Sequence, residues 1–370
     1  MPLTAVHEAH GATFEERGGH RVVAEYGRPE RAHQAVRNVV GVIEQSDDVL
    51  VVTGEDRIEY VDNAVSNDIP REDGRGVYAL LLTPQGTIRT DMYVYNAGER
   101  LLVFVPPGKG ESLAAEWNEM TFIQDVEIAV ATDEFGIFGV HGPKATEKIA
   151  SVFSETTPDD HLQFVRGSMG DEGVTVIRTD ALTGEEGYEV VCSDADSEAV
   201  FDTLENRGLN AAPFGYRTWD SLTLEAGTPL FHTELDGRLP NNIGLVNAVD
   251  YEKGCFVGQE VVSRVENRGQ PSQRLVGLTV EAVSAGGETT AADSPETGAA
   301  VFDGDEHIGE VTRTVQSPTL GIPIAFALVE YGLDAPTDGL AVRIDGENHG
   351  ASAVDLPFVD GSDRSARLPA

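Results

Sequence analysis

The stretch that decides how this chain is interpreted runs Lys253-Gly254-Cys255-Phe256-Val257-Gly258-Gln259-Glu260-Val261-Val262-Ser263-Arg264. It contains Cys255, one of only two cysteines in 370 residues. Gly254 and Gly258 permit a close backbone approach or unusual dihedral angles. Lys253 and Arg264 would favour the reactive thiolate form of Cys255 if they lay beside it. The alternative is that Cys255 is buried and packs as a small hydrophobic side chain.

Length and composition indicate a folded protein of two or three packed units. No run of 18 apolar residues is present, so we expect no membrane span. The first ten residues lack a charged region followed by an apolar one, so we expect no secretory signal and a cytoplasmic protein. Cys192 and Cys255 are not a disulfide framework, and no spacing of cysteines and histidines predicts a metal site.

The formal net charge of −37 is extreme, with 63 acidic residues against 26 basic ones. The acids are spread along the whole chain, and 40% of the residues are hydrophobic, which is not the composition of a disordered acidic segment. An acidic surface of this kind is expected of a protein from a salt-rich cytoplasm, where a Debye length of about 3 Å screens self-repulsion. The same charge argues against nucleic acid as a partner, because phosphates must be neutralised by cations.

Hydrophobic patterning predicts a mixture of strands and helices up to residue 268. Residues 30–45 carry apolar side chains at helical spacing after Pro29, which suits a first helical turn. Residues 49–52 indicate a buried strand, and residues 77–82 and 88–95, separated by a Pro-Gln-Gly turn, indicate a hairpin. These units do not alternate regularly, which favours an α+β fold over a doubly wound sheet.

The pattern changes after Arg264. Residues 268–273, rich in Gly, Gln, Pro and Ser, have the composition of a linker. Short strands without helical periodicity follow, and their even spacing indicates a small barrel or sandwich. Residues 281–297 are acidic and rich in Thr, Gly and Ala, which predicts a loop. We therefore expect one region over 1–268 and a C-terminal β-domain over 269–370.

A second informative stretch runs Thr183-Gly184-Glu185-Glu186-Gly187-Tyr188-Glu189. Taken alone, most of it has the composition of an acidic, solvated turn. Glu189 differs because it lies inside an apolar strand pattern, and a buried carboxylate requires a partner or a ligand. No GxGxxG motif follows a strand and no P-loop is present, so nucleotide-binding folds gain little support.

The stretch around Cys255 resembles the signature of the YgfZ-type folate-binding proteins, which are implicated in maintaining iron–sulfur enzymes. The signature positions matched here are Lys253, Gly254, Cys255, Phe256, Gly258, Gln259, Glu260 and Arg264. YgfZ-type proteins are relatives of the glycine-cleavage T-protein, an aminomethyltransferase. The resemblance implies a functional thiol at Cys255, near the mouth of a folate cavity.

The resemblance to the T-protein extends over nearly the whole chain. Its motifs are matched by residues 10–19, 52–68, 78–95, 183–189, 224–230, 308–320 and 356–358. It implies a folate-binding α+β region of two interleaved subdomains over 1–268, followed by a small β-barrel over 269–370.

The T-protein resemblance also implies roles for single residues. Asp91 corresponds to the catalytic acid beside the reactive end of folate, while Thr90 replaces an adjacent aspartate. Tyr78 and Glu189 correspond to residues that contact folate, Glu189 at the pterin ring. A departure occurs where the family has an arginine, because Trp219 stands there and Arg217 lies two residues earlier as a candidate substitute.

These resemblances lead us to expect a tetrahydrofolate-binding YgfZ-type protein with a role in iron–sulfur enzyme maintenance. The alternative is an aminomethyltransferase that uses a lipoyl carrier protein, releases ammonia and makes methylenetetrahydrofolate. A related alternative is a folate-dependent demethylase of a small methylated substrate. The remaining alternative is a non-catalytic scaffold that binds an iron–sulfur protein through the region around Cys255.

Overall fold

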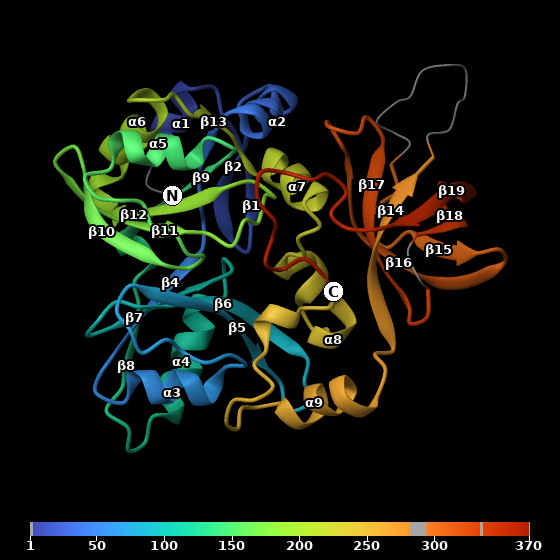
Figure 1. The fold of residues 1–370 in the computed structure, drawn as a ribbon, viewed down its shortest axis with the longest axis horizontal. Coiled ribbons are helices and arrows are strands. Elements are labelled where there is room, and N and C mark those ends of the chain that lie inside the picture. The colour runs from blue at the N-terminus through green and yellow to red at the C-terminus, as the bar shows by residue number, and fades with distance from the viewer. Residues whose placement is uncertain (1–2, 282–293, 334–335, 370) are drawn as a thin grey trace.

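The computed structural model describes residues 3–281, 294–333 and 336–369. The chain forms two sheet-and-helix bodies, one above the other in Figure 1, and a β-barrel beside them. This is the α+β architecture with a C-terminal barrel that the sequence predicts, and the expectation of the fold class is confirmed. Most of the loop expected at 281–297 lies outside the described residues.

The first body is a six-stranded sheet in the order β10-β11-β12-β9-β3-β13. Its strands are β3 (Gly41–Glu44), β9 (Phe135–His141), β10 (Phe164–Met169), β11 (Glu172–Arg178), β12 (Gly187–Ser193) and β13 (Ala212–Pro213). Helices α1 (Thr4–Ala9), α2 (Pro29–Asn38), α5 (Ala145–Val152) and α6 (Ser197–Asn206) lie on its outer side (Figure 1). The hairpin β1 (Thr13–Arg17) and β2 (His20–Glu25) lies beside helix α7 (Tyr216–Glu225).

The second body is a five-stranded sheet in the order β5-β6-β7-β4-β8. Its strands are β4 (Asp48–Thr53), β5 (Arg75–Leu82), β6 (Ile88–Asn96), β7 (Leu101–Val105) and β8 (Glu127–Val130), covered by α3 (Arg57–Ala64) and α4 (Gly110–Met120). The expected hairpin of 77–82 and 88–95 is the antiparallel pair β5–β6. The chain then adds η3 (Phe231–Leu235), α8 (Pro240–Ile243) and α9 (Gln259–Arg268). Gly237 donates to the Ile88 carbonyl, so this late segment packs on the second sheet.

The two bodies are interleaved along the chain. The sequence begins in the first sheet, crosses to the second sheet after residue 44, and returns to the first sheet at residue 135. A shared hydrophobic cluster joins the facing sides of the two sheets, with Val49, Tyr95 and Phe104 from one and Ile137 and Val191 from the other. Both sheets therefore bury two faces, which explains their nearly continuous apolar strands.

The barrel is closed, in the order β14-β17-β16-β15-β18-β19. Its strands are β14 (Gln273–Val280), β15 (Ala300–Asp303), β16 (Glu306–Gln316), β17 (Pro323–Glu330), β18 (Thr337–Ile344) and β19 (Glu347–Val354). The domain boundaries expected from the sequence assign all of residues 269–370 to the barrel, but the last barrel strand ends at Val354 and the tail that follows lies outside the barrel. Val359 donates to the Glu225 carbonyl and Ala366 to the Asp180 carbonyl, so the tail crosses back over the first region.

One local expectation is wrong. The helix predicted over 30–45 ends at Asn38, and Gly41–Glu44 form strand β3. Strand β3 is buried along its whole length and pairs with β9 on one side and β13 on the other. Pairing in the middle of a sheet overrides the helical spacing of Val39, Val40 and Ile43, all of which have β-branched side chains that suit a strand.

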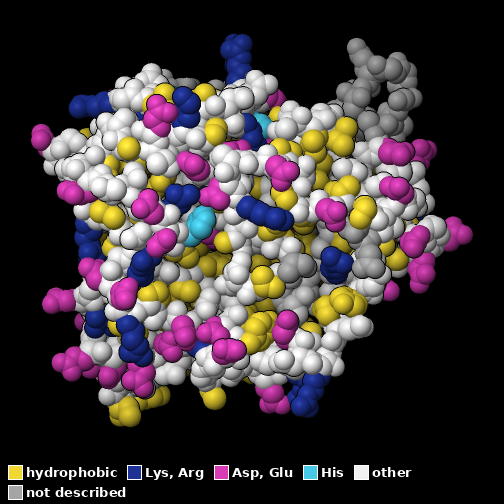
Figure 2. All heavy atoms as spheres, in the orientation of Figure 1, with side chains coloured by type: hydrophobic (Ala, Val, Ile, Leu, Met, Phe, Trp, Pro, Cys, Tyr) yellow, Lys and Arg dark blue, Asp and Glu magenta, His cyan; other side chains and the backbone are white. Residues whose placement is uncertain are grey.

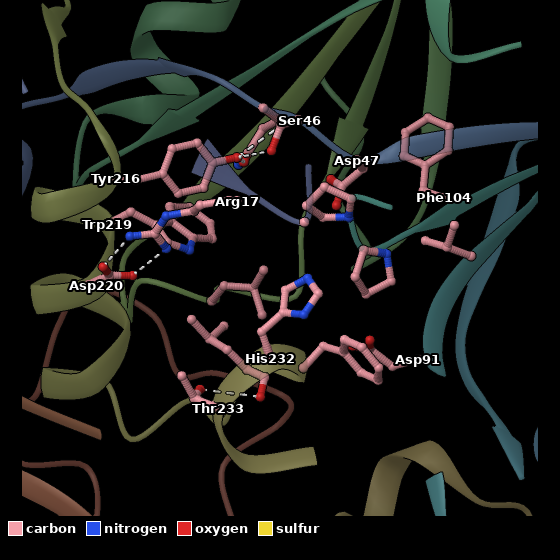
Figure 3. A pocket seen from close by; sticks show the side chains of 18 of the residues that line it. Arg17, Ser46, Asp47, Asp91, Phe104, Tyr216, Trp219, Asp220, His232 and Thr233 are labelled. Carbon is pink, nitrogen blue, oxygen red and sulfur yellow. Dashed lines mark hydrogen bonds and ion pairs between the residues drawn. The ribbon is translucent and has the colours of Figure 1, made fainter. Parts of the chain in front are cut away.

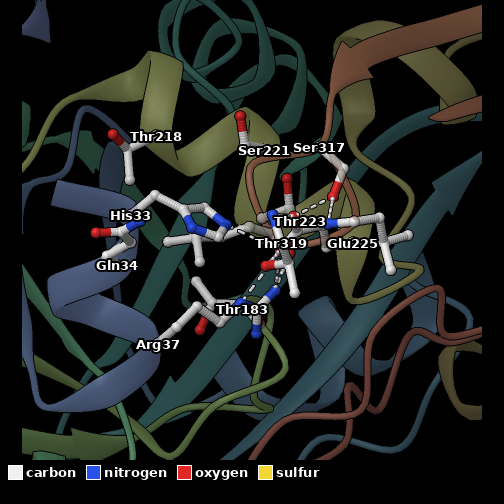
Figure 4. A network of polar contacts seen from close by, with 12 residues as sticks. His33, Gln34, Arg37, Thr183, Thr218, Ser221, Thr223, Glu225, Ser317 and Thr319 are labelled. Carbon is white, nitrogen blue, oxygen red and sulfur yellow. Dashed lines mark hydrogen bonds and ion pairs between the residues drawn. The ribbon is translucent and has the colours of Figure 1, made fainter. Parts of the chain in front are cut away.

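A buried polar network fastens the barrel to the first body (Figure 4). Glu225, at the end of α7, accepts hydrogen bonds from His33 Nε2 at 2.8 Å and Arg37 Nη2 at 2.9 Å, both from α2. It also accepts from the hydroxyls of Ser317 and Thr319 at 2.5 and 3.0 Å, which lie between β16 and β17. Glu225 is completely buried, so its ionised carboxylate is stable only because these partners donate hydrogen bonds to it.

Acidic side chains are spread over the visible face of the molecule rather than gathered in one patch (Figure 2). This agrees with the even distribution of acids along the chain. No helix in the described parts of the chain is long and apolar enough to cross a membrane.

Candidate active site

Strand periodicity brings Asp91 and Glu189 to facing sides of the two sheets. In β6, Met92 and Val94 point to the helices α3 and α4, so the alternate residues Asp91 and Tyr93 point the other way, toward the first sheet. In β12, Val190 packs under the helices of the first body, and Glu189 points toward the second sheet. Asp91 and Glu189 thus both face the junction of the two bodies.

A cavity of about 600 Å³ opens at this junction. Its apolar wall includes Phe104, Leu182, Trp219, Leu230 and Phe231. Its charged lining includes Arg17, Asp47, Asp91, Glu189, Asp220, Arg313 and Arg367. Figure 3 shows Asp47, Asp91 and Phe104 on one side and the Arg17–Asp220 pair with Tyr216 and Trp219 on the other. A mostly apolar cavity of this size with a few charged groups is typical of a small-molecule site.

Asp91 is held by two buried partners. Tyr78 donates its hydroxyl to Asp91 Oδ2 at 2.9 Å, and Arg367 Nη1 donates to the same oxygen at 2.8 Å. The other oxygen, Oδ1, is buried and has no hydrogen-bond partner among the described residues. Tyr78 does not line the cavity itself, and burial raises its pKa well above the usual value. Tyr78 therefore acts as a neutral donor that orients Asp91.

Arg367 is the residue that sequence reasoning missed most completely. It lies in the tail after the barrel, and its guanidinium carbon stands 4.0 Å from the centre of the Tyr78 ring and 4.9 Å from that of Tyr93. Its Nε is 3.5 Å from Asp180 Oδ2, which also accepts from the Tyr93 hydroxyl at 2.7 Å. Nothing in the local sequence marks this arginine, because only the return of the tail brings it to the cavity.

Glu189 is buried, and its Oε2 has no hydrogen-bond partner in the described structure. Burial and the neighbouring carboxylates of Asp47 and Asp180 raise the pKa of Glu189 to about 8. Burial and the charge of Asp91 likewise raise the pKa of Asp47 to about 7. The cavity thus has an acidic end whose carboxyl groups hold protons near neutral pH.

Arg217, the expected substitute for the family arginine, does not line the cavity. Its side chain is 58% exposed, and its Nη1 pairs with Glu25 at 3.1 Å. Helical spacing explains this, because Tyr216, Trp219 and Asp220 share the face of α7 that lines the cavity while Arg217 projects elsewhere. The arginine that does reach this wall is Arg17 of β1, which is bound to Asp220 through both terminal nitrogens.

The Lys253–Arg264 stretch forms a loop and a helix fastened to the second body. Lys253 Nζ is buried and donates to the carbonyls of Asp62, Val65 and Asn67 at 2.8–3.1 Å, at the end of α3. Gly258 has φ +83°, and a Cβ there would lie 2.6 Å from the Thr83 carbonyl oxygen. These two positions are therefore explained by packing.

Phe256 and Val262 are buried in a hydrophobic cluster that also includes Leu80, and the remaining positions are exposed or half-exposed. Gln259 Nε2 donates to the Lys253 carbonyl, and Arg264 pairs with Glu260 on the exposed side of α9. A Cβ at Gly254 would meet nothing within 4 Å. Cys255 is exposed and is not among the residues that line the cavity, contrary to its expected place at the mouth.

Comparison with known proteins identifies the family. Residues 3–253 match the GCVT N-terminal domain, and residues 273–360 match the glycine cleavage T-protein C-terminal barrel domain. The chain belongs to the glycine cleavage T-protein family. Members of this family use tetrahydrofolate. Nothing in these matches supports the narrower YgfZ-type membership expected from the Cys255 signature.

Similar proteins agree with this family. The aminomethyltransferase of Saccharopolyspora erythraea is 32% identical over 367 residues, covering 96% of this chain and 97% of the relative. The probable aminomethyltransferase of Halobacterium salinarum is 30% identical over 372 residues, covering 97% and 98%. The glycine cleavage system aminomethyltransferase T of Bartonella henselae has the same fold, with a TM-score of 0.84, 24% identity and 98% of each chain covered.

Proposed function

We propose that this protein is a folate-dependent aminomethyltransferase. The observation that carries the proposal is Asp91, which lines the cavity with one oxygen fixed by Tyr78 and Arg367 and the other without a partner. Full-length similarity to aminomethyltransferases supports the same reaction. The sequence indicates an aminomethyltransferase as the alternative to an iron–sulfur maintenance role, and the similarity to aminomethyltransferases now favours this alternative.

The cavity fits the ligand that this reaction requires. A reduced pterin presents several N–H donors and a flat ring, which match the buried, unpartnered oxygens of Glu189 and Asp91 and the aromatic walls of Phe104 and Trp219. Tetrahydrofolate supplies two nitrogens that accept the one-carbon unit. Glu189 would bind the pterin edge, and Asp91 would lie beside the reacting nitrogens.

The transfer needs two proton movements. An aminomethyl group leaves a lipoyl sulfur and becomes the methylene bridge between two folate nitrogens. The two N–H protons of folate end on the sulfur and on the departing amine, so the products are a thiol, ammonia and methylenetetrahydrofolate. Asp91, oriented by Tyr78 and Arg367, is the group placed to hold or move a proton at these nitrogens.

The test separates binding from chemistry. We expect Asp91→Asn to retain tetrahydrofolate binding by calorimetry in molar KCl while its rate of methylenetetrahydrofolate formation from an aminomethyl-lipoyl carrier falls at least about 100-fold. Asp133→Asn, an exposed position outside the cavity, is the matched control. Equal turnover by Asp91→Asn and the wild type would contradict the role of Asp91.

A second candidate role rests on Cys255 alone. The thiol is exposed on a loop that Lys253 and Gly258 fix to the second body, as a scaffold for an iron–sulfur protein would require. If this role applies, Cys255→Ser abolishes support of an iron–sulfur enzyme while leaving aminomethyl transfer intact. An unchanged activity of that enzyme in cells carrying Cys255→Ser would remove this candidate.

A further inference from the structure

Apart from the exposed Glu16, two carboxyl groups that line the cavity have no protein partner among the described residues. Arg17 is occupied by Asp220, Arg313 stands 3.3 Å from Glu234, and Arg367 binds Asp91. Among the described residues, Asp47 and Glu189 make no side-chain hydrogen bond or ion pair, although both line the cavity. A side chain that faces a binding cavity without a partner is available to a ligand.

Asp47 occupies the connection between the two bodies. It follows β3 of the first sheet and precedes β4 of the second, and the Gln45 amide donates to the Ile137 carbonyl at 2.8 Å, which fixes the start of this connection. Its neighbour Asp48 is fully engaged, with the Gly110 amide at 2.7 Å and His20 at 2.9 Å. Asp47 has no such partners, and its carboxyl group projects toward the cavity in Figure 3.

We propose that Asp47 contacts the ligand directly, as the second member of a carboxyl pair with Glu189 that accepts N–H groups from the reduced pterin of a bound folate. The inference rests on the proposed function. Glu189 alone can accept two N–H groups from one edge of a pterin, whereas a reduced pterin carries further donors on its other ring. The carboxyl group of Asp47 would accept one of these further N–H donors.

The pair of Asp47 and Glu189 also predicts that folate binding is coupled to the release of a proton. In the empty cavity the two carboxyl groups hold a proton near neutral pH, because burial opposes the ionisation of both, Asp91 further raises the pKa of Asp47, and Asp47 further raises that of Glu189. N–H donors from the ligand favour ionised acceptors, so binding releases that proton to the solvent. The charged and titratable groups around the pair are Asp48, Asp91, Tyr95, Asp180, Tyr216 and Arg367, with His20, Arg21, Asp133 and Asp194 behind Asp47.

Calorimetry of tetrahydrofolate binding tests the inference. The full chain is titrated at pH 7 in molar KCl, in two buffers of different ionisation enthalpy, so that the number of released protons is measured. The wild type is expected to release about one proton. Asp47→Asn is expected to bind about 10- to 100-fold more weakly, because a charge-assisted hydrogen bond is lost. It should also release fewer protons than the wild type, because Asp47 no longer contributes one and Glu189 loses one of the charges that raise its pKa, while burial and Asp180 still raise it.

Two further variants control the experiment. Asp133→Asn removes the same charge from the far side of the connection, and it should leave affinity and proton release unchanged. Asp47→Glu keeps the carboxyl group, and it should retain proton release with weakened affinity. Asp47→Asn should melt no lower than the wild type, because it removes a carboxylate that its neighbours repel.

The outcomes separate this inference from the proposed function. A folded wild type that does not bind tetrahydrofolate would overturn the proposed function and the inference with it. Wild-type binding that Asp47→Asn leaves unchanged in affinity and proton release would overturn the inference alone. Equal loss of affinity in Asp47→Asn and Asp133→Asn would also overturn it, because a general charge effect would then explain the result.

Discussion

Arg367 of the C-terminal tail donates from Nη1 to Asp91 Oδ2 over 2.8 Å, and both side chains are buried. The contact links the end of the chain to the second sheet across 276 residues. It also supplies a positive charge to a cavity lined by Asp47, Asp91 and Glu189, and its Nε lies 3.5 Å from the buried Asp180 carboxylate. The tail is therefore part of the candidate active site and not an appendage of the barrel.

Replacement of Arg367 tests this relationship. We expect Arg367→Ala to lower the rate of one-carbon transfer about 10- to 100-fold and to destabilise the protein by about 3–5 kcal/mol, because it leaves buried carboxylates without their cation. Arg364→Ala, an exposed position of the same tail, is the control. Turnover and chemical unfolding in high salt measure both effects, and an Arg367→Ala protein as active as the control would refute the role.

The Glu225 network makes stability depend on pH. Burial alone raises the pKa of Glu225, but hydrogen bonds and charges from His33, Ser317 and Arg37 outweigh it and lower the pKa from 4.5 to about 2. A depressed pKa stabilises the fold above the unfolded value, and the contribution is lost as the pH falls from about 4.5 toward 2. The shift corresponds to roughly 3 kcal/mol at neutral pH.

We therefore expect Glu225→Gln to lower the free energy of unfolding at pH 7 by about 3–5 kcal/mol, because it leaves buried cations unpaired. The difference from the wild type should shrink as the pH is lowered below 4.5. Glu198→Gln, on the exposed side of α6, should have no measurable effect. A difference that stays constant between pH 7 and pH 3 would show that the carboxylate charge is not the stabilising feature.

The Lys253–Arg264 stretch should divide into structural and dispensable positions. Lys253→Met removes three hydrogen bonds to buried or half-buried carbonyls and should cost about 2–4 kcal/mol of stability. Cys255→Ser changes an exposed side chain and should alter stability by less than about 0.5 kcal/mol. Thermal unfolding of the two variants measures the contrast, and a Lys253→Met protein as stable as Cys255→Ser would contradict it.

The surface charge predicts a dependence on salt. With a net charge of −37, self-repulsion destabilises the compact state at low ionic strength and is screened in molar salt. We expect the melting temperature to rise between 0.1 M and 3 M KCl, measured by calorimetry at constant pH. A flat melting temperature over this range would count against adaptation to salt.

The sequence predicts the fold class and two of the carboxyl groups that line the cavity, since strand alternation and motif resemblance carry that information locally. Asp91 and Glu189 face the same cavity because each lies at a definite phase of an apolar strand. The same strand alternation predicts that Tyr93 lines the cavity, because Tyr93 and Asp91 lie on the same face of β6. The pairing of Gly41–Glu44 was not predictable, because its helical spacing is overridden by long-range strand contacts.

Arg367, Asp47 and Asp180 lie beyond local reasoning. Arg367 reaches the cavity through the returning tail, and Asp47 reaches it through the crossing between the two bodies. Arg217 is a false positive of sequence comparison. It lies two residues from the position of the family arginine, which predicted a contact with folate, but its place on helix α7 turns the side chain toward Glu25. Cys255 attracts attention because the chain has only two cysteines, but its side chain is exposed. The neighbouring Lys253 and Gly258 are the positions that packing constrains.

The most direct test of aminomethyl transfer is a single-turnover experiment in molar KCl that measures methylenetetrahydrofolate and ammonia together. Excess enzyme is mixed with tetrahydrofolate and an aminomethyl-lipoyl carrier. We expect equal amounts of the two products, formed at one rate that Asp91→Asn lowers at least about 100-fold. Methylenetetrahydrofolate formed without ammonia, or tetrahydrofolate bound with no product at all, would contradict aminomethyl transfer.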